Sequence, residues 1–290
     1  MADITPALIA KLREMTNAGV MDCKRALQET SGNLEAAVDV LRKRGRATAA
    51  KKALREAREG MIAQHIAPGA RTGVLVEVNC ETDFVAKNEE FRAFCGLAAR
   101  TLASDPAADL EPARVELVAK TRENVRLARY QRFEVSGNGV VAAYIHTGAK
   151  IGVLVEVGAG KAETLERDEF RQLVRDLTLQ IAAANPLAVS RPQVDPAVVA
   201  KERDIATNSD LVKNKPPKAV ERIIEGKIEK FYQTACLLEQ GFVKKSSEVT
   251  VREHVASVEK QLTDEVTVRR FVRFQLGESF SGEAASGSAA

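Results

Sequence analysis

The strongest constraint on the fold of this chain is an internal repeat. The string GVLVEV occurs at Gly73–Val78 and again at Gly152–Val157, 79 residues further along. The same offset pairs Gly60 with Gly139 and the string EFR with its second occurrence, so the two copies align without an insertion or a deletion. Because there are only two copies and the period is long, we expect a duplicated subdomain and not a solenoid.

Each copy has the pattern of a β-hairpin, a connecting loop and a helix. Apolar runs surround the turns PGAR and TGAK, which predicts the hairpins, and a helical pattern follows each of them. A further helix and a strand follow each copy, after Pro112 and in the last quarter of the chain. The predicted elements are helices at Asn88–Ala103, Arg167–Ala184 and Val251–Leu262, and strands near Val125–Val135 and Val266–Leu276. This order predicts an α+β core of two small antiparallel sheets with helices.

The N-terminal region has a different pattern, that of three short helices. Thr5 is suited to cap the first helix and Pro6 to occupy its first turn, and we expect the third helix to end at Gly45. The basic, alanine-rich segment Arg44–Glu59 lacks an apolar stripe wide enough for a core. It is therefore predicted to be a solvated helical linker.

A proline-rich stretch interrupts the second copy and introduces two helices, Ala197–Thr207 and Pro217–Tyr232. The apolar stripe of the second helix could pack on its partner helix or pair two chains into a homodimer through 197–232. The expected organisation is a three-helix domain at 1–45, a linker at 46–59, a first core subdomain at 60–136, a second at 137–185 and 236–279, an inserted helical hairpin at 186–235, and a flexible tail at 280–290.

Signatures of enzymes are missing from the sequence. There is no phosphate-binding loop, dinucleotide fingerprint or nucleophile elbow. The four cysteines are scattered and the three histidines lie far apart, so we expect no catalytic residues, no metal site and no cofactor. No apolar run could cross a bilayer, which predicts no membrane association and a cytoplasmic location. The net charge of +3 is too small to indicate nucleic-acid binding.

The two copies differ at the loop that follows GVLVEV. Thr82, Asp83, Phe84 and Val85 in the first copy correspond to the sequence KAET at 161–164 in the second. One interpretation is structural, with Phe84 filling a gap in the first subdomain and Asp83 capping the helix that begins near Lys87. The other is functional, because an aromatic residue on a loop held by a rigid hairpin and helix can anchor another protein.

The sequence around this loop, CETDFVAKNEEF, resembles the signature of the bacterial elongation factor Ts family, the exchange factors of the GTPase elongation factor Tu. LREMTNAGVMDCKRAL is similar to the UBA-like N-terminal domain of that family. HTGAKIGVLVEV resembles its second subdomain, KPPKAVERIIEGKIEKFY its helical hairpin, and VTVRRFVRFQLGE its closing strand. The resemblance runs in family order from Met1 to about Glu278.

The resemblance implies an exchange factor that binds elongation factor Tu carrying GDP, dislodges Mg²⁺ and releases GDP so that GTP can bind. Phe84 would be the wedge and Asp83 its polar partner, and Thr82 and Val85 would hold the loop. Weaker matches are Arg13, Val20 and Met21, which contact the nucleotide-binding domain in the family, and His146, which faces another domain. Some relatives end in a further helix that touches the GTPase, and the tail SGEAASGSAA is poorly suited to that contact.

A second interpretation remains open beside the exchange factor. The basic segment Arg42–Arg58, with Arg126, Arg129 and Arg132, could bind RNA or the ribosome. No aromatic residue interleaves with the charges of the basic segment, although stacking on bases needs them. Direct binding of nucleic acid is therefore not the expected function.

Overall fold

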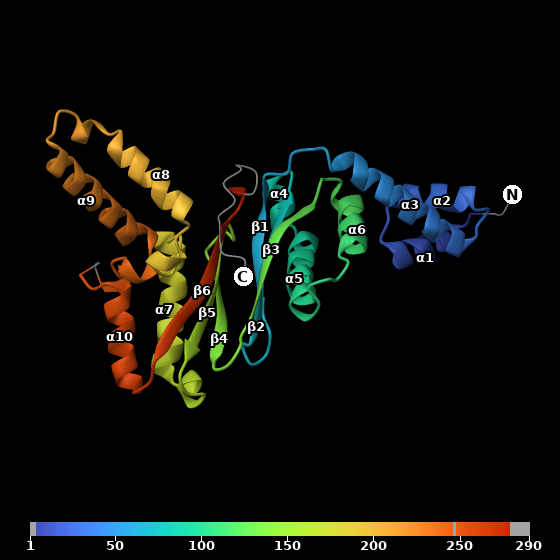
Figure 1. The fold of residues 1–290 in the computed structure, drawn as a ribbon. Helices are drawn as coiled ribbons and strands as arrows, with labels where there is room; N and C mark the ends of the chain where they lie inside the picture. The colour runs from blue at the N-terminus through green and yellow to red at the C-terminus, as the bar shows by residue number, and fades with distance from the viewer. Residues whose placement is uncertain (1–3, 246–247, 279–290) are drawn as a thin grey trace. The chain divides into compact units, whose positions relative to one another are not determined.

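The structure is a computed structural model that describes residues 4–245 and 248–278, so the predicted tail at 280–290 lies outside the described residues. The chain divides into two compact units. Met1–Ala63 and Val76–Tyr130 form one, and Gln64–Leu75 and Gln131–Ala290 form the other. N-terminal helices precede two three-stranded sheets, which confirms the predicted α+β class (Figure 1).

Three N-terminal helices form as predicted. They are α1 (Pro6–Thr16), α2 (Val20–Glu29) and α3 (Leu34–Lys52). The side chain of Thr5 caps α1 by accepting a hydrogen bond from the Leu8 amide at 3.3 Å, and Asn17 ends the helix in a left-handed conformation. The small core between these helices consists of Leu12, Cys23, Ala26, Leu27 and Ala37.

The third helix does not end at Gly45, as the sequence had suggested, but continues to Lys52. Helix α3 packs against α6 (Glu111–Thr121), and a Cβ at position 45 would lie 3.2 Å from Cγ1 of Val115. The glycine therefore allows close approach of two helices instead of ending one. Ala49 and Ala57 are buried, so the segment is not solvated on all sides, and the domain boundary at residue 45 stays a prediction.

The first sheet has the strand order β1-β2-β3, with β1 at Glu59–Ile66, β2 at Thr72–Cys80 and β3 at Arg126–Glu134. Two helices follow β2 in the chain, the short α4 (Asp83–Lys87) and the longer α5 (Glu89–Ser104), and α5 packs against α6. The buried side of α5 consists of Phe91, Phe94, Cys95, Ala98, Ala99, Leu102 and Ala103.

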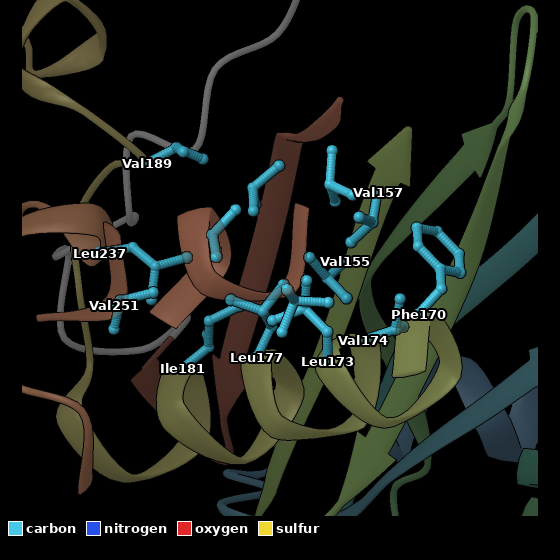
Figure 2. Close-up of a cluster of buried hydrophobic side chains, with 14 of the residues drawn as sticks. Val155, Val157, Phe170, Leu173, Val174, Leu177, Ile181, Val189, Leu237 and Val251 are labelled. Atoms are coloured by element: carbon cyan, nitrogen blue, oxygen red, sulfur yellow. The ribbon is translucent and has the colours of Figure 1, made fainter. Parts of the chain in front are cut away.

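The second sheet has the order β4-β5-β6 and is antiparallel throughout, with β4 at Gly139–Ile145, β5 at Ile151–Ala159 and β6 at Val266–Gln275. Helix α7 (Asp168–Ala184) packs on β4 and β5, and α10 (Val251–Leu262) packs on α7. Figure 2 shows the resulting core, in which Phe170, Leu173, Leu177 and Ile181 of α7 face Val155 and Val157 of β5.

The repeat extends to backbone conformation and to buried charge. Both hairpin turns place a glycine and then an alanine at positive φ, with values of 81° and 53° in the first turn and 86° and 55° in the second. Glu77 and Glu156, the acids of the two GVLVEV strings, are both buried. Each accepts a 2.7 Å hydrogen bond from Nε of an arginine on the third strand of its sheet, Arg129 and Arg270 respectively. A buried carboxylate needs such a partner, so the ion pair belongs to the scaffold.

The insertion in the second copy is the pair of helices α8 (Pro196–Thr207) and α9 (Pro217–Ala235), which pack on each other. In the apolar stripe of α9, Ile228 is buried, and Phe231 packs on the cluster of Ala188, Val194 and Cys236. The stripe thus packs largely within the chain, and pairing of two chains through it stays a prediction.

The chain enters and leaves this insertion at neighbouring backbone positions. The amide of Leu187 donates to the Ala235 carbonyl at 2.8 Å, and the amide of Leu237 donates to the Ala188 carbonyl at 2.8 Å. Arg191 also donates to the carboxylates of Glu229 and Glu239.

Five short 3₁₀ helices occur in the described part of the second unit: η1 (Glu163–Glu166), η2 (Arg191–Gln193), η3 (Asp210–Val212), η4 (Leu237–Glu239) and η5 (Val243–Lys245).

Gly60 of β1 gives a direct test of the backbone packing between β1 and β2. Its φ is 139°, and a Cβ there would lie 2.1 Å from the carbonyl oxygen of Val78. We expect Gly60→Ala to lower the free energy of unfolding by about 2–4 kcal/mol, through backbone strain and the clash. Thermal unfolding followed by circular dichroism measures the effect.

The matched control is Gly226→Ala in α9, where the added Cβ meets no atom within 4 Å. That variant should gain about 0.5–1 kcal/mol, because alanine is the better helix former. A Gly60→Ala protein that melts like the unsubstituted chain would contradict the described backbone of β1.

Candidate functional site

The loop that differs between the copies forms a short helix at the end of β2. Thr82 precedes α4, and its hydroxyl accepts a hydrogen bond from the Val85 amide at 3.3 Å, which caps the helix. The helix ends at Asn88, whose side chain accepts from the Glu90 amide at 2.7 Å and caps α5. Asn88 therefore has the role that the structural interpretation had assigned to Asp83, and that assignment is wrong.

A carboxylate distant in sequence holds this loop. Oε2 of Glu123 accepts hydrogen bonds from the amides of Glu81 and Thr82, both at 3.0 Å, and Oε1 accepts from the Thr82 hydroxyl at 2.6 Å. Helix α6 ends at Arg122, whose left-handed conformation (φ 59°) turns the chain back toward the loop. Hydrogen bonds to an ionised acceptor are stronger than neutral ones, so Glu123 clamps the first two residues of the loop.

The neighbours of Glu123 complete the clamp. The Asn124 amide donates to Oε1 of Glu81 at 2.6 Å, and Sγ of Cys80 donates to the Thr82 carbonyl at 3.2 Å. Burial raises the pKa of the Cys80 thiol to about 12, so it remains protonated and can donate. Sequence reasoning missed Glu123. The available signal was an acid directly after a helix in both copies, Glu123 and Asp264.

Phe84 lies on the outside of this clamped loop and is 82 % exposed. The interpretation in which Phe84 fills a gap in the core is therefore wrong. Asp83 is exposed too, and its carboxylate accepts a 2.7 Å hydrogen bond from Nζ of Lys87, which lowers the pKa of Asp83. Val85 is half-buried. The loop thus presents one aromatic ring and one carboxylate to solvent.

The second copy keeps the clamp and lacks the ring. Asp264 follows α10, which ends at Thr263 in the same left-handed conformation (φ 53°). Its Oδ2 accepts from the Lys161 amide at 2.9 Å and from the Thr164 hydroxyl at 2.6 Å. The residue at the position of Phe84 is Glu163, which is exposed. The scaffold therefore folds with either side chain, and nothing in the packing requires phenylalanine at position 84.

The four weaker site residues lie at two other places. Val20 and Met21 begin α2 and are 48 % and 61 % exposed, and Arg13 lies in the last turn of α1, also exposed. They share the turn between these helices. His146 is exposed on the second hairpin turn, and its Nδ1 lies 3.0 Å from the hydroxyl of Tyr144. Arg13, Val20 and Met21 belong to the first unit, as Phe84 does, and His146 belongs to the second.

The arginines of the RNA-binding interpretation are largely engaged within the protein. Arg129 pairs with the buried Glu77 at 2.7 Å, and Arg132 with Glu134 at 2.6 Å. Charges used in this way are less available to phosphates. The segment Arg42–Arg58 lies partly in α3, one side of which packs on α6.

Clusters of metal-ligating side chains and helices of membrane-spanning character were both sought in the described part of the chain. Nowhere in residues 4–245 and 248–278 do three or more His, Cys, Asp or Glu side chains gather closely enough to hold a metal ion. Within the same ranges, no helix combines the length and the apolar character of a membrane span.

Comparison with known proteins decides the family. The sequence model of the family described as "Elongation factor TS" matches residues 81–278, beginning one residue before Thr82. Elongation factor Ts of Nitratidesulfovibrio vulgaris strain DP4 is 41 % identical over 285 residues, covering 98 % of this chain and 99 % of the relative. This chain belongs to the elongation factor Ts family. The family resemblance inferred from the sequence is thereby confirmed.

Other elongation factor Ts proteins match to a similar extent. That of Symbiobacterium thermophilum is 43 % identical, covering 96 % of this chain and 93 % of the relative. That of Chloroherpeton thalassium is 42 % identical, covering 96 % of this chain and all of the relative. Membership in the elongation factor Ts family gives the chain a role in translation elongation. The α1–α2 turn lies outside the span of the family model.

Glu123→Ala tests the clamp. It would leave the amides of Glu81 and Thr82 without their acceptor, and we expect a loss of about 1–3 kcal/mol in the free energy of unfolding. The loop at residues 81 and 82 should lose more of its order than the protein as a whole loses stability. Hydrogen exchange at the amides of residues 81 and 82, measured by NMR, should accelerate at least about tenfold.

Asp264→Ala is the matched control from the second copy. It should release the Lys161 amide and leave exchange at residues 81 and 82 unchanged. Equal protection of the first loop in Glu123→Ala and in the unsubstituted chain would show that Glu123 does not hold it.

Proposed function

We propose that this chain is a guanine nucleotide exchange factor for elongation factor Tu, with Phe84 as an apolar wedge and Asp83 as its polar partner. The observation that carries the proposal is a ring 82 % exposed on a loop whose backbone is clamped by Glu123. Exposing phenylalanine to water is unfavourable, and this position does not need it, as Glu163 in the second copy indicates. A contact with another protein accounts for the ring.

A clamped loop suits a wedge for an entropic reason. Ordering a flexible loop on binding costs free energy that reduces affinity. Thr82 caps α4 and is itself held at both its amide and its hydroxyl, so the backbone beneath Phe84 is ordered before a partner arrives. Binding then mainly has to order the side chain of Phe84. Less of the favourable free energy of the contact is lost in ordering the loop, and more of it remains as affinity.

Exchange of this kind needs no bond chemistry. A GTPase holds its nucleotide through backbone amides of the phosphate loop and a magnesium ion. A protein that binds the nucleotide-free form better than the nucleotide-bound form weakens nucleotide binding by the same factor, because the coupling is reciprocal. The proposal therefore describes a binding protein with no active site of its own, acting in the cytoplasm.

Asp83 would act through its charge. The hydrogen bond from Lys87 lowers the pKa of Asp83, so the carboxylate is ionised at neutral pH. Both side chains are exposed, and an exposed ion pair contributes little to stability. The pair can therefore open at low cost and let Asp83 accept hydrogen bonds from the partner. Arg13, Val20, Met21 and His146 would add further contacts.

Phe84→Ala should separate exchange from folding. Removing a buried interfacial anchor typically costs about 2–4 kcal/mol. If the contact forms chiefly in the nucleotide-free complex, release of GDP slows by about 30- to 1000-fold, at ~1.4 kcal/mol per decade. The measurement is stopped-flow release of fluorescent GDP from elongation factor Tu, beside thermal unfolding of the variant alone.

Glu163→Ala is the matched control, since Glu163 has the equivalent place in the second copy. With Glu163→Ala, elongation factor Tu should release GDP as fast as with the unsubstituted factor. Both variants should have melting temperatures within about a degree of that of the unsubstituted factor. Normal exchange by Phe84→Ala would overturn the wedge.

Magnesium should oppose the factor. The ion favours the nucleotide-bound state that the wedge disfavours, so raising free Mg²⁺ should reduce stimulated release more than it reduces spontaneous release. A titration of Mg²⁺ at fixed factor concentration measures the ratio of the two rates. A ratio independent of Mg²⁺ would indicate that the wedge acts without displacing the ion.

A salt series distinguishes the RNA-binding alternative. Binding through phosphates weakens steeply as salt rises, whereas an apolar wedge contact weakens little. The affinity for elongation factor Tu should therefore fall only modestly between low and physiological salt.

A further inference from the structure

Leu54 is the other large apolar side chain of the first unit that is almost wholly exposed, at 92 %. It lies in the connection between α3 and β1. A single exposed leucine is ordinary on a protein surface and indicates nothing alone. What distinguishes this one is how its turn is held.

The turn of Leu54 is fastened at both ends. The Arg55 amide donates to the Lys52 carbonyl at 2.8 Å, which closes the turn. Nζ of Lys52 donates to the carbonyl of Arg122, and Nδ2 of Asn124 donates to the Arg55 carbonyl at 2.7 Å. The turn of Leu54 is thus joined to residues 122–124 through the side chain of Lys52 on one side and the backbone carbonyl of Arg55 on the other.

Two residues of the same segment, Glu123 and Asn124, hold the loop of Phe84. Glu123 binds the amides of Glu81 and Thr82, and the Asn124 amide donates to Glu81 at 2.6 Å. The Arg55 guanidinium also lies 3.5 Å from the Glu81 carboxylate. Figure 1 shows the α3–β1 connection and α4 at the same end of β1. Residues 122–124 therefore fix two exposed apolar side chains, Leu54 and Phe84, at one end of the unit.

We propose that Leu54 is a second apolar contact with the partner that Phe84 enters, so that the docking face extends onto the α3–β1 turn. The proposal rests on the proposed function for the identity of the partner, elongation factor Tu. Residues 122–124 bind both turns, and we therefore infer one partner and not two. Both turns are held by one segment, so the two side chains keep a fixed relation to each other before a partner binds.

The two contacts have different tasks. Phe84 acts on the nucleotide site, and its loss slows release. Leu54 binds the partner equally whether or not nucleotide is present, so it contributes affinity without contributing to the release step. The expected signature is a higher half-saturating concentration with an unchanged rate at saturation.

The first experiment measures stimulated GDP release over a range of factor concentrations. For Leu54→Ala we expect the half-saturating concentration to rise about tenfold, as for an interfacial leucine of moderate weight, with the plateau rate retained. Leu54→Asp should raise it further, because a charge would be desolvated at the contact. Leu97→Ala, an exposed leucine of α5 in the same unit, should leave both parameters unchanged.

The second experiment reports on location directly. All four native cysteines are buried, and burial raises the pKa of each thiol, so an exposed cysteine introduced by Leu54→Cys can be labelled selectively. An environment-sensitive dye at this position should shift its emission to the blue when nucleotide-free elongation factor Tu is added. The same dye attached to Leu97→Cys should not respond.

The outcomes separate this proposal from the proposed function. Unchanged half-saturation for both Leu54 variants, with no dye response, overturns the second contact and leaves the wedge standing. Weaker binding and a dye response at position 54, with normal release by Phe84→Ala, retain Leu54 as an interface residue and overturn the wedge. If the unsubstituted chain does not bind elongation factor Tu at all, both proposals fall.

Discussion

The carboxylate of Glu123 is the interaction on which the candidate site depends. It accepts three hydrogen bonds from Glu81 and Thr82, which lie 42 and 41 residues earlier in the sequence, and its neighbours Arg122 and Asn124 hold the turn of Leu54. Without this acceptor, two part-buried amides would face no partner, and unsatisfied amides are costly. The order of the Phe84 loop is thus a consequence of one carboxylate, which is placed by the left-handed backbone conformation of Arg122 at the end of α6.

Duplication makes it possible to separate scaffold from function without an alignment of relatives. Both copies keep the hairpin turns, the buried glutamate with its arginine, and an acid after the last helix. These recur because each subdomain must satisfy the same buried groups. The exposed ring does not recur. A residue that one copy has and the other lacks, on a loop that both clamp, is free of the requirements of folding.

The repeat made most of the fold predictable, since hairpins, helices and the insertion followed from periodicity and offset. Gly45 misled because glycine near a basic stretch is typical of a helix end, and only the position of Val115 across the helix pair explains it. Phe84 was found by comparing the copies. The clamp and Leu54 were not found, because both depend on contacts between segments distant in sequence, which spacing along the chain cannot indicate.

The backbone hydrogen bonds at the base of the helical hairpin have an evolutionary consequence. Because the backbone at Leu187 and Ala188 is hydrogen-bonded to residues 235 and 237, the chain leaves the core and returns to it within one backbone contact. A change in the length of the segment between those points therefore leaves the two ends joined at the core. The hairpin is therefore the place in the second subdomain where the length of the chain can change without separating the residues that enclose it.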